Sequence, residues 1–360
     1  MACLCLLALA ACRHGEDLPV PSPEVETVQL IISVPNAAVG SRAIGDPGTA
    51  VDEGADWDQL AVILAYTADS PVVLPGGSKV QVVTLSKDDF ETLPFYNKTQ
   101  FRLLSIDAQL GTVYIYGVTY SAGVAGNPER AINQCTTDAA VKALTISNDY
   151  SKPADDTVTN TIDYAKFVSV ATGYYKGKAT DNQPAEFDIQ QGGTGQVGNM
   201  PTMTLTRLAT KLDIQWDAAD AYEQGYTDVK VTSFSYQGKE KGRLFPEVTL
   251  PSSKTIENKD KSWTFYNNSE ISQRNGRVYH YTFTDGILAT GADSKTTPGV
   301  TFKISAKKSG ETIPDDGYSY TLNFTDALKQ AAWYKVNATI KGITGSGTIT
   351  FGDASVGGES

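Results

Sequence analysis

A cysteine near the start of the chain carries the clearest chemical signal in the sequence. Residues 4–11 form an almost unbroken apolar run that ends in Leu-Ala-Ala directly before Cys12. Bacterial lipoproteins are cut and acylated at such a pattern, and the run has the length of a signal peptide rather than the roughly 20 residues of a membrane helix. We expect a signal peptide over residues 1–11 and lipid on Cys12, with an ordinary secretory signal as the alternative.

Catalytic side chains are scarce in the rest of the sequence. The chain has two histidines: His14 follows the signal segment closely, and His280 lies inside a strand-like run. A Ser/His/Asp or Cys/His set would depend on His280, which we interpret as a surface or cross-strand residue. Once Cys12 carries lipid, Cys135 has no second thiol, so we expect no disulfide, zinc site or redox pair. We predict that the chain is not an enzyme, with a hydrolase as the weakest alternative.

Acidic residues are numerous but match no known kind of site. Asp52, Glu53, Asp56 and Asp58 lie in one polar stretch, yet their spacing fits no standard calcium loop, so we expect no metal. No glycine-rich turn between a strand and a helix offers a phosphate site, and we expect no cofactor. The net charge of -11 comes from 41 acidic and 30 basic residues without a basic patch. This excess of negative charge argues against nucleic acid as a partner.

The elements that carry these residues are predicted to be mainly β-strands. Val28, Leu30, Ile32 and Val34 alternate with other residues, which predicts a strand with one strongly apolar face. The pair Asn275-Gly276 is a hairpin signal before a strand over 278–283. Further strands are predicted at 60–66, 80–85, 101–106, 112–120, 164–172, 208–216, 229–236, 302–306, 318–324 and 336–340, with short helices within 128–144 and a helical turn within 326–332.

The length of the chain predicts two folded domains. About 350 residues follow Cys12, enough for two separate cores, and the glycine-rich stretch 190–199 is the best boundary between them. We divide the chain into a signal peptide, a lipidated propeptide that includes the first strand, an N-terminal domain, a C-terminal domain and a terminal segment. Their predicted bounds are 1–11, 12–42, 43–198, 199–342 and 343–360.

The last residues also read as a strand. After three glycines between 342 and 347, Ile349 and Phe351 alternate with threonines. A strand behind a glycine hinge, with no evident partner in its own chain, is prone to pair with the edge of another sheet. We therefore expect residues 343–360 to connect this chain to another molecule.

Taken in order, these features resemble a known family. The likeness rests on the cysteine motif ending at Cys12, the Gly-Ser-Arg-Ala loop 40–43, the strand at 60–66, the segment LTRLATKL at 205–212 and the segment WYKVNATIKG at 333–342. This series is similar to the fimbrillins of Bacteroidales, the type V pilins, over nearly the whole chain. We expect an all-β fold with a few short helices, arranged as two tandem β-sandwich domains of the transthyretin-like or Greek-key type.

The resemblance also implies a way of assembly. In this family an outer-membrane lipoprotein precursor is cut by an arginine-specific protease of the gingipain type, which on this sequence corresponds to a cut between Arg42 and Ala43. The strand with Val28, Leu30, Ile32 and Val34 is displaced, and the open groove receives the C-terminal strand of another subunit. Here that donor strand offers Ile349 and Phe351, preceded by Ile343.

The implied partners are therefore copies of this chain, other pilus subunits, the protease and, for the precursor, the outer membrane through its lipid. The mature form is expected outside the cell, in surface fimbriae that support adhesion. Within the same family, a tip or an anchor subunit is the first alternative to a shaft subunit. A glycan-binding surface lipoprotein is another, in which Tyr174, Tyr175 and Trp263 would form a stacking platform.

Overall fold

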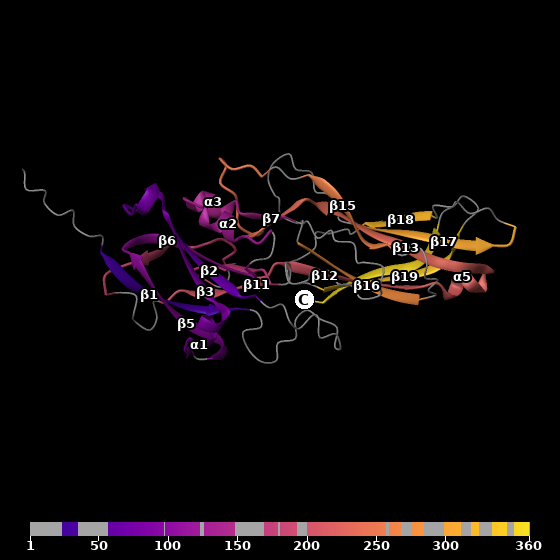
Figure 1. The fold of residues 1–360 in the computed structure, drawn as a ribbon, viewed down its shortest axis with the longest axis horizontal. Helices are drawn as coiled ribbons and strands as arrows, with labels where there is room; N and C mark the ends of the chain where they lie inside the picture. Colours follow the sequence, from indigo (N-terminus) through magenta and orange to yellow (C-terminus); the bar gives the residue numbers. More distant parts are fainter. Residues whose placement is uncertain are drawn as a thin grey trace, which may run out of the picture.

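The computed structural model shows an elongated all-β molecule with a few short helices (Figure 1). The all-β sandwich class is thus confirmed, while the transthyretin-like or Greek-key type stays a prediction. No helix among the described residues is long and apolar enough to cross a membrane. The structure describes residues 24–34, 57–96, 98–122, 126–147, 169–178, 181–192, 200–256, 259–267, 275–283, 299–310, 318–323, 333–343 and 349–359.

Two sheets form the sandwich at the N-terminal end of the molecule. Sheet A has the order β10, β1, β5 and β4, with bounds Thr202–Thr204, Val25–Ser33, Lys98–Gln109 and Phe95–Tyr96. Sheet B has the order β11, β8, β6, β2 and β3, with β9 also paired to β6. Its bounds are Thr206–Arg207, Ala171–Tyr174, Gly111–Tyr120, Gln59–Tyr66, Val80–Ser86 and Phe187–Ile189.

Strand β2 explains why sheet B has two buried faces. Its run Leu-Ala-Val-Ile-Leu-Ala is apolar throughout, which is typical of a strand covered on both sides. Leu60, Val62 and Leu64 face sheet A in one core cluster, whereas Ala61 and Ile63 belong to a second cluster on the opposite face. Sheet B is therefore the middle layer of this half of the molecule.

Short helices and one more strand pair lie beside that second cluster or at the edge of the sandwich. Helix α1 begins after Ser86, whose hydroxyl accepts a hydrogen bond from the amide of Asp89 at 3.1 Å. Helix α3 begins after Thr137, which caps the amide of Ala140 at 3.2 Å in the same way. The bounds are Lys87–Thr92 for α1, Glu129–Asn133 for α2, Asp138–Lys142 for α3, Pro75–Gly77 for the 3-10 helix η1, and Thr145–Ser147 and Lys241–Arg243 for the paired strands β7 and β14.

The C-terminal half is a second pair of sheets around its own cluster. Sheet D has the order β16, β12, β19 and β20, and sheet E the order β15, β13, β17 and β18. Leu212, Phe234, Phe302 and Val336 are among the buried residues that the two sheets share. The bounds are Asn275–Phe283, Ala209–Asp217, Trp333–Ile343, Ile349–Glu359, Asp260–Asn267, Tyr226–Lys239, Gly299–Lys308, Tyr318–Asn323 and, for helix α5, Ala219–Glu223.

Most strands lie where alternation predicted them, but the hairpin prediction is wrong. Asn275 and Gly276 are the first two residues of β16 and pair with Asp217 and Trp216 of β12. Gly276 is needed for packing, because a Cβ atom there would collide with the indole ring of Trp216. The strand predicted at 164–172 is described only from residue 169, with β8 at Ala171–Tyr174, and the turn predicted at 326–332 lies outside the described residues.

The predicted division at residues 198 and 199 stays a prediction. Residues on its C-terminal side contribute to the first half of the molecule. β10 pairs with β1, and β11 pairs with β8. Phe245 lies in the second cluster of the first half, with its ring centroid 5.0 Å from that of Tyr116.

Candidate functional site

Strand β1 is an interior strand of sheet A. It pairs with β5 in an antiparallel ladder along its nine residues, from Val25 opposite Gln109 to Ser33 opposite Phe101. On its other side it pairs in parallel with β10 through Ile31–Ser33. The amide of Ile31 also donates to the carbonyl of Pro201 at 2.9 Å. Removal of β1 would therefore leave backbone groups of β5 and β10 without partners.

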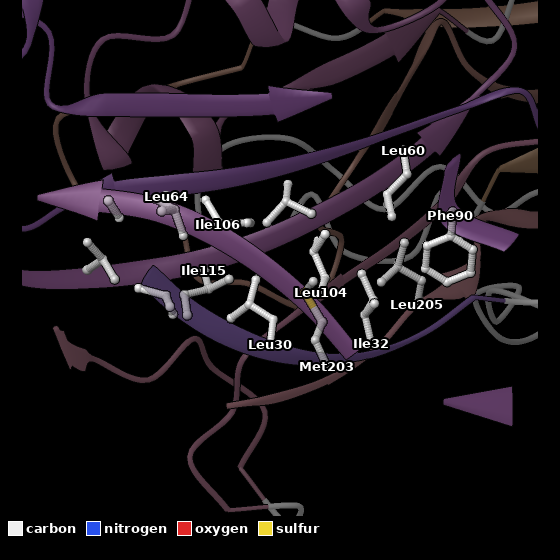
Figure 2. Packing of buried hydrophobic residues seen from close by; sticks show 14 of the residues in the cluster. Leu30, Ile32, Leu60, Leu64, Phe90, Leu104, Ile106, Ile115, Met203 and Leu205 are labelled. Atoms are coloured by element: carbon white, nitrogen blue, oxygen red, sulfur yellow. The ribbon is translucent and has the colours of Figure 1, made fainter. Parts of the chain in front are cut away.

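The inward face of β1 fills the core of the N-terminal sandwich. Val28, Leu30, Ile32 and Val34 are 0%, 2%, 0% and 4% exposed, so the predicted apolar face is present. Figure 2 shows Leu30 and Ile32 beside Leu104 and Met203. Burial of such a side chain contributes about 1.5–3 kcal/mol, so β1 contributes on the order of 6–12 kcal/mol as an upper value.

Only one covalent connection joins β1 to the sheets that follow it. The next described residue after Val34 is Trp57, which is buried and packs edge-on against Phe90 with ring centroids 5.5 Å apart. Arg42 and Ala43 lie in the intervening segment, outside the described residues, as does Cys12. A cut in that segment would leave β1 attached to the molecule by hydrogen bonds and packing alone.

A buried arginine that the sequence reasoning missed lies at one end of this core. Arg102 of β5 is directly opposite Ile32 of β1 and is 8% exposed. Its guanidinium carbon lies 3.6 Å from the ring centroid of Phe95, and one terminal nitrogen donates to the carbonyl of Leu93 at 2.7 Å. Within the described residues its Nε has no hydrogen-bond partner. The signal in the sequence was a charge on the same parity as Leu104.

The terminal strand has a partner inside the chain. β20 pairs in an antiparallel ladder with β19, from Ile343 opposite Ile349 to Trp333 opposite Glu359. The expectation of a strand without a partner in its own chain is therefore corrected. β12 pairs with one edge of β19, and β20 pairs with the other edge. Of the three predicted donor residues, Ile343 ends β19, whereas Ile349 and Phe351 lie in β20.

Two of the three aromatic residues of the glycan-binding alternative, Tyr174 and Tyr175, pack against different core clusters. Tyr174 is buried in the second cluster of the first half, and its hydroxyl donates to the carbonyl of Asn182 at 3.0 Å. Tyr175 packs toward the cluster between sheets A and B, edge-on to Phe187 at 5.7 Å between ring centroids. The side chain of Trp263 lies outside the described residues. These two tyrosines therefore do not make one stacking platform.

The remaining candidate residues, Cys135, Asp58 and His280, lie in separate parts of the fold. Cys135 is buried, and loss of hydration raises the pKa of its thiol to about 11. A carboxylate oxygen of Asp58 accepts from the amide of Ala122 at 2.6 Å. His280 lies in β16 opposite Leu212, with its side chain outside the described residues. Where the structure describes the chain, no three His, Cys, Asp or Glu side chains gather closely enough to hold a metal ion.

No family model matches the sequence. No curated protein matches it either. Solved structures are similar in fold at low identity. A proposed cell adhesion protein from Parabacteroides distasonis has 11% identity and a TM-score of 0.49, covering 92% of this chain and 96% of that one. A fimbrial assembly protein from the same species has 12% identity and a TM-score of 0.42, covering 94% and 100%.

The tip fimbrial protein Mfa3 from Porphyromonas gingivalis, with a C-terminal truncation, has 11% identity and a TM-score of 0.41, covering 91% and 99%. Likenesses at these identities concern the fold. The function of this chain therefore depends on its own residues and geometry.

Proposed function

We propose that this chain is a structural subunit of a cell-surface fimbria that polymerises by exchange of a β-strand. In this proposal Cys12 is lipidated for export to the outer membrane, and an arginine-specific protease cuts between Arg42 and Ala43. The released strand β1 then gives way to the C-terminal strand of another copy. The mature subunit begins at Ala43 and serves adhesion from the shaft of the fibre.

The observation that carries the proposal is the position of β1. It is the first strand that the structure describes and fills an interior place in sheet A, with four inward side chains in the core. It is joined to the rest by the segment that contains Arg42. A strand that a single cut detaches is suited to replacement. Its loss opens a groove in which backbone groups lack hydrogen-bond partners and apolar side chains are exposed, and another strand can supply both.

The contact that forms in this way is directional. One subunit contributes its groove in the N-terminal half and its neighbour contributes a segment from the C-terminal end. Such head-to-tail contacts do not close on themselves and therefore build filaments. The elongated shape of the molecule in Figure 1, with sheets A and B at one end and sheets D and E at the other, suits a filament of this kind.

The proposal is tested with purified precursor and an arginine-specific protease. The cut protein is expected to have Ala43 as its new N-terminus and to form ladders that resist heating on a denaturing gel. The matched control is Arg42→Ala, which should keep its N-terminal segment and stay monomeric under the same treatment. Cut protein that stays monomeric would rule out the shaft role.

Deletion of residues 345–360 tests the donor. Because β20 pairs with β19 at the edge of sheet D, its removal should leave the rest of the fold intact. The deleted protein should still be cut at Arg42 but should give no ladder. A ladder of unchanged length would show that another segment joins the subunits.

A tip subunit of the same fibre is a second candidate, favoured by the docking of β20 on β19 of its own chain. A subunit that keeps this strand docked accepts a donor but donates none. Mixing cut protein with the 345–360 deletion variant separates the two roles. A shaft subunit should form ladders on its own and also donate its strand to the deletion variant, whereas a tip subunit, which donates no strand, should stay monomeric alone and in the mixture.

A further inference from the structure

We infer that Arg102 fixes the register of the incoming strand by pairing with Asp353 of a second copy of this chain. The inference rests on the proposed function, and it assigns a specificity-determining residue in the groove that β1 occupies. In the assigned register Ile349 takes the place of Val28, Phe351 that of Leu30 and Asp353 that of Ile32.

The surroundings of Arg102 are unusual for a buried charge. Arg102 is only 8% exposed. A charge that is so deeply buried normally has a carboxylate or several acceptors around it. Its described contacts are the carbonyl of Leu93 and the ring of Phe95, and its Nε is buried without a hydrogen-bond partner among the described residues. Strand β1 places Ile32 directly opposite it. The precursor strand therefore offers no acceptor where the groove has a spare donor.

The terminal strand carries the missing acceptor on the correct face. Ile349, Phe351 and Asp353 share one parity, so a strand that points the first two inward also points the third inward. Residues directly opposite each other in an antiparallel pair have Cβ atoms about 4.5–5.5 Å apart. A carboxylate opposite Arg102 is thus within reach of its guanidinium. In the free chain Asp353 lies where the register of β20 against β19 is irregular.

Other registers satisfy the groove less well. A shift by one residue turns the apolar side chains outward. A shift by two in one direction places Asp353 opposite Leu104, which is 3% exposed, and so buries an unpaired carboxylate. A shift by two in the other direction fills the place of Val28 with Gly347 and leaves a void in the core. Of these registers, only the assigned one places apolar side chains at both Val28 and Leu30 together with a carboxylate opposite Arg102.

The larger Phe351 is accommodated by a flexible neighbour. Met203 of β10 lies between Leu30 and Ile32 in the view of Figure 2, and its side chain approaches Gly117 of β6. Methionine is unbranched and adapts to the shape of its surroundings. The exchange of Leu for Phe therefore changes the packing at a position that can adjust.

Charge reversal tests the pair in the full-length chain. Arg102→Glu or Asp353→Lys should each slow ladder formation after the cut by about tenfold or more, because each leaves a buried charge without its partner. The double variant should recover most of the lost rate. The controls are Arg130→Glu, at an exposed position, and Glu359→Lys, a second charge reversal in the same strand as Asp353, and both should assemble like the unchanged protein. Asp353→Lys lies outside the N-terminal core, so its effect is not a folding defect of the groove.

Disulfide crosslinking between engineered cysteines measures the register of the incoming strand directly. Ser105 lies opposite Gln29, so the assigned register places Thr350 of the neighbour opposite Ser105. The variant Ser105→Cys/Thr350→Cys should form disulfides between subunits on oxidation. The control Asp107→Cys/Thr350→Cys reports the shift that buries Asp353, and Leu103→Cys/Thr350→Cys reports the opposite shift. Both controls should stay reduced.

The outcomes separate this inference from the proposed function. Ladders that are unaffected by both charge reversals, or that crosslink through Asp107→Cys or Leu103→Cys, overturn the pairing while the assembly mechanism stands. A double variant that is no faster than either single variant also overturns it. If the unchanged protein forms no ladder after the cut, the proposed function fails, and the inference fails with it.

Discussion

Leu30 is the residue on which the first prediction depends. It lies opposite Leu104 in the ladder between β1 and β5 and is 2% exposed. We expect Leu30→Ala to lower the free energy of unfolding of the precursor by about 2–5 kcal/mol, since it leaves a cavity in the core. Urea denaturation measures this. The half-buried neighbour Gln29→Ala serves as the control and should change stability by much less.

The same substitution should have no effect on the finished fibre. After the cut and the exchange, Leu30 is no longer part of the subunit under the proposed function. Ladders made from the Leu30→Ala precursor should therefore resist heating as well as those made from the unchanged protein. A fibre that is destabilised by Leu30→Ala would show that β1 stays in its groove.

Tyr114 gives a prediction about alkaline pH. Loss of hydration and then a hydrogen bond to Glu186, with 3.0 Å between the two oxygens, raise the pKa of Tyr114 to about 12. An ordinary tyrosine has a pKa near 10, so the folded state favours the protonated form. This contribution to stability is fully present below about pH 10 and is lost as the pH rises toward 12.

Tyr114→Phe should therefore weaken the fall in thermal midpoint that the unchanged protein shows above pH 10. The fall should not vanish, because burial also raises the pKa of Tyr174 to about 12. Melting curves recorded every half pH unit from 8 to 11.5 test this. Identical slopes in the two proteins would contradict the assigned role of Tyr114.

At the residue scale, sequence patterns identified which side chains face the core. The alternation of Val28, Leu30 and Ile32 was sufficient, because period two follows from strand geometry alone. It was not sufficient for Arg102. Its parity marks it as inward, but its neighbours come from two distant stretches of the chain, Ile32 in β1 and the pair Leu93 and Phe95. A single sequence does not say which strands will pair.

At the scale of elements, Arg243 of β14 holds a segment of the second half against the first. Its guanidinium donates to the carbonyls of Pro246 at 3.3 Å, Lys142 at 3.2 Å and Val248 at 2.6 Å. We expect Arg243→Met to lower the free energy of unfolding by at least about 2 kcal/mol, because buried carbonyls lose their donor. Arg130→Met, on the exposed side of α2, is the matched control and should change it by less than about 0.5 kcal/mol.

The elements show where prediction from sequence ends. Strands with clear alternation were located, and both short helices at α2 and α3 lie inside the predicted range 128–144. Pairing was not predicted: β1 joins β5 and β10, which are far from it in sequence. The docking of β20 was missed for the same reason, since the alternation of Ile349 and Phe351 describes a strand and not its neighbour.

At the scale of the whole molecule, charge should govern the rate of assembly. The full chain has a net charge of -11, and residues 1–42 hold two basic and four acidic residues, so the subunit from Ala43 onward carries -11 + 2 = -9. Subunits of like charge repel each other over a Debye length of about 30 Å at about 0.01 M salt and about 8 Å at about 0.15 M. Ladder formation should therefore become several-fold faster when NaCl is raised over this range.

The salt dependence has a clear control. A variant that adds surface charge of the same sign, such as Lys241→Glu, should increase the effect, since it makes each subunit more negative. Slower assembly at about 0.15 M salt would mean that attraction between exposed charges, rather than repulsion, dominates the encounter. Buried pairs are screened far less and should change little in this range.

The hydrogen-bonded ladders on the two sides of β1 differ in length, and this sets the order in which its residues can separate from the sheet. Among the described residues, Val25–Leu30 pair with β5 alone, whereas Ile31–Ser33 pair with both β5 and β10. We therefore expect β1 to separate first at Val25, the end remote from Arg42, and last at Ile31–Ser33. An incoming strand would therefore pair first beside Gln109 and extend its pairing toward Arg102. The contact with Arg102 would form last, after the rest of the register is set.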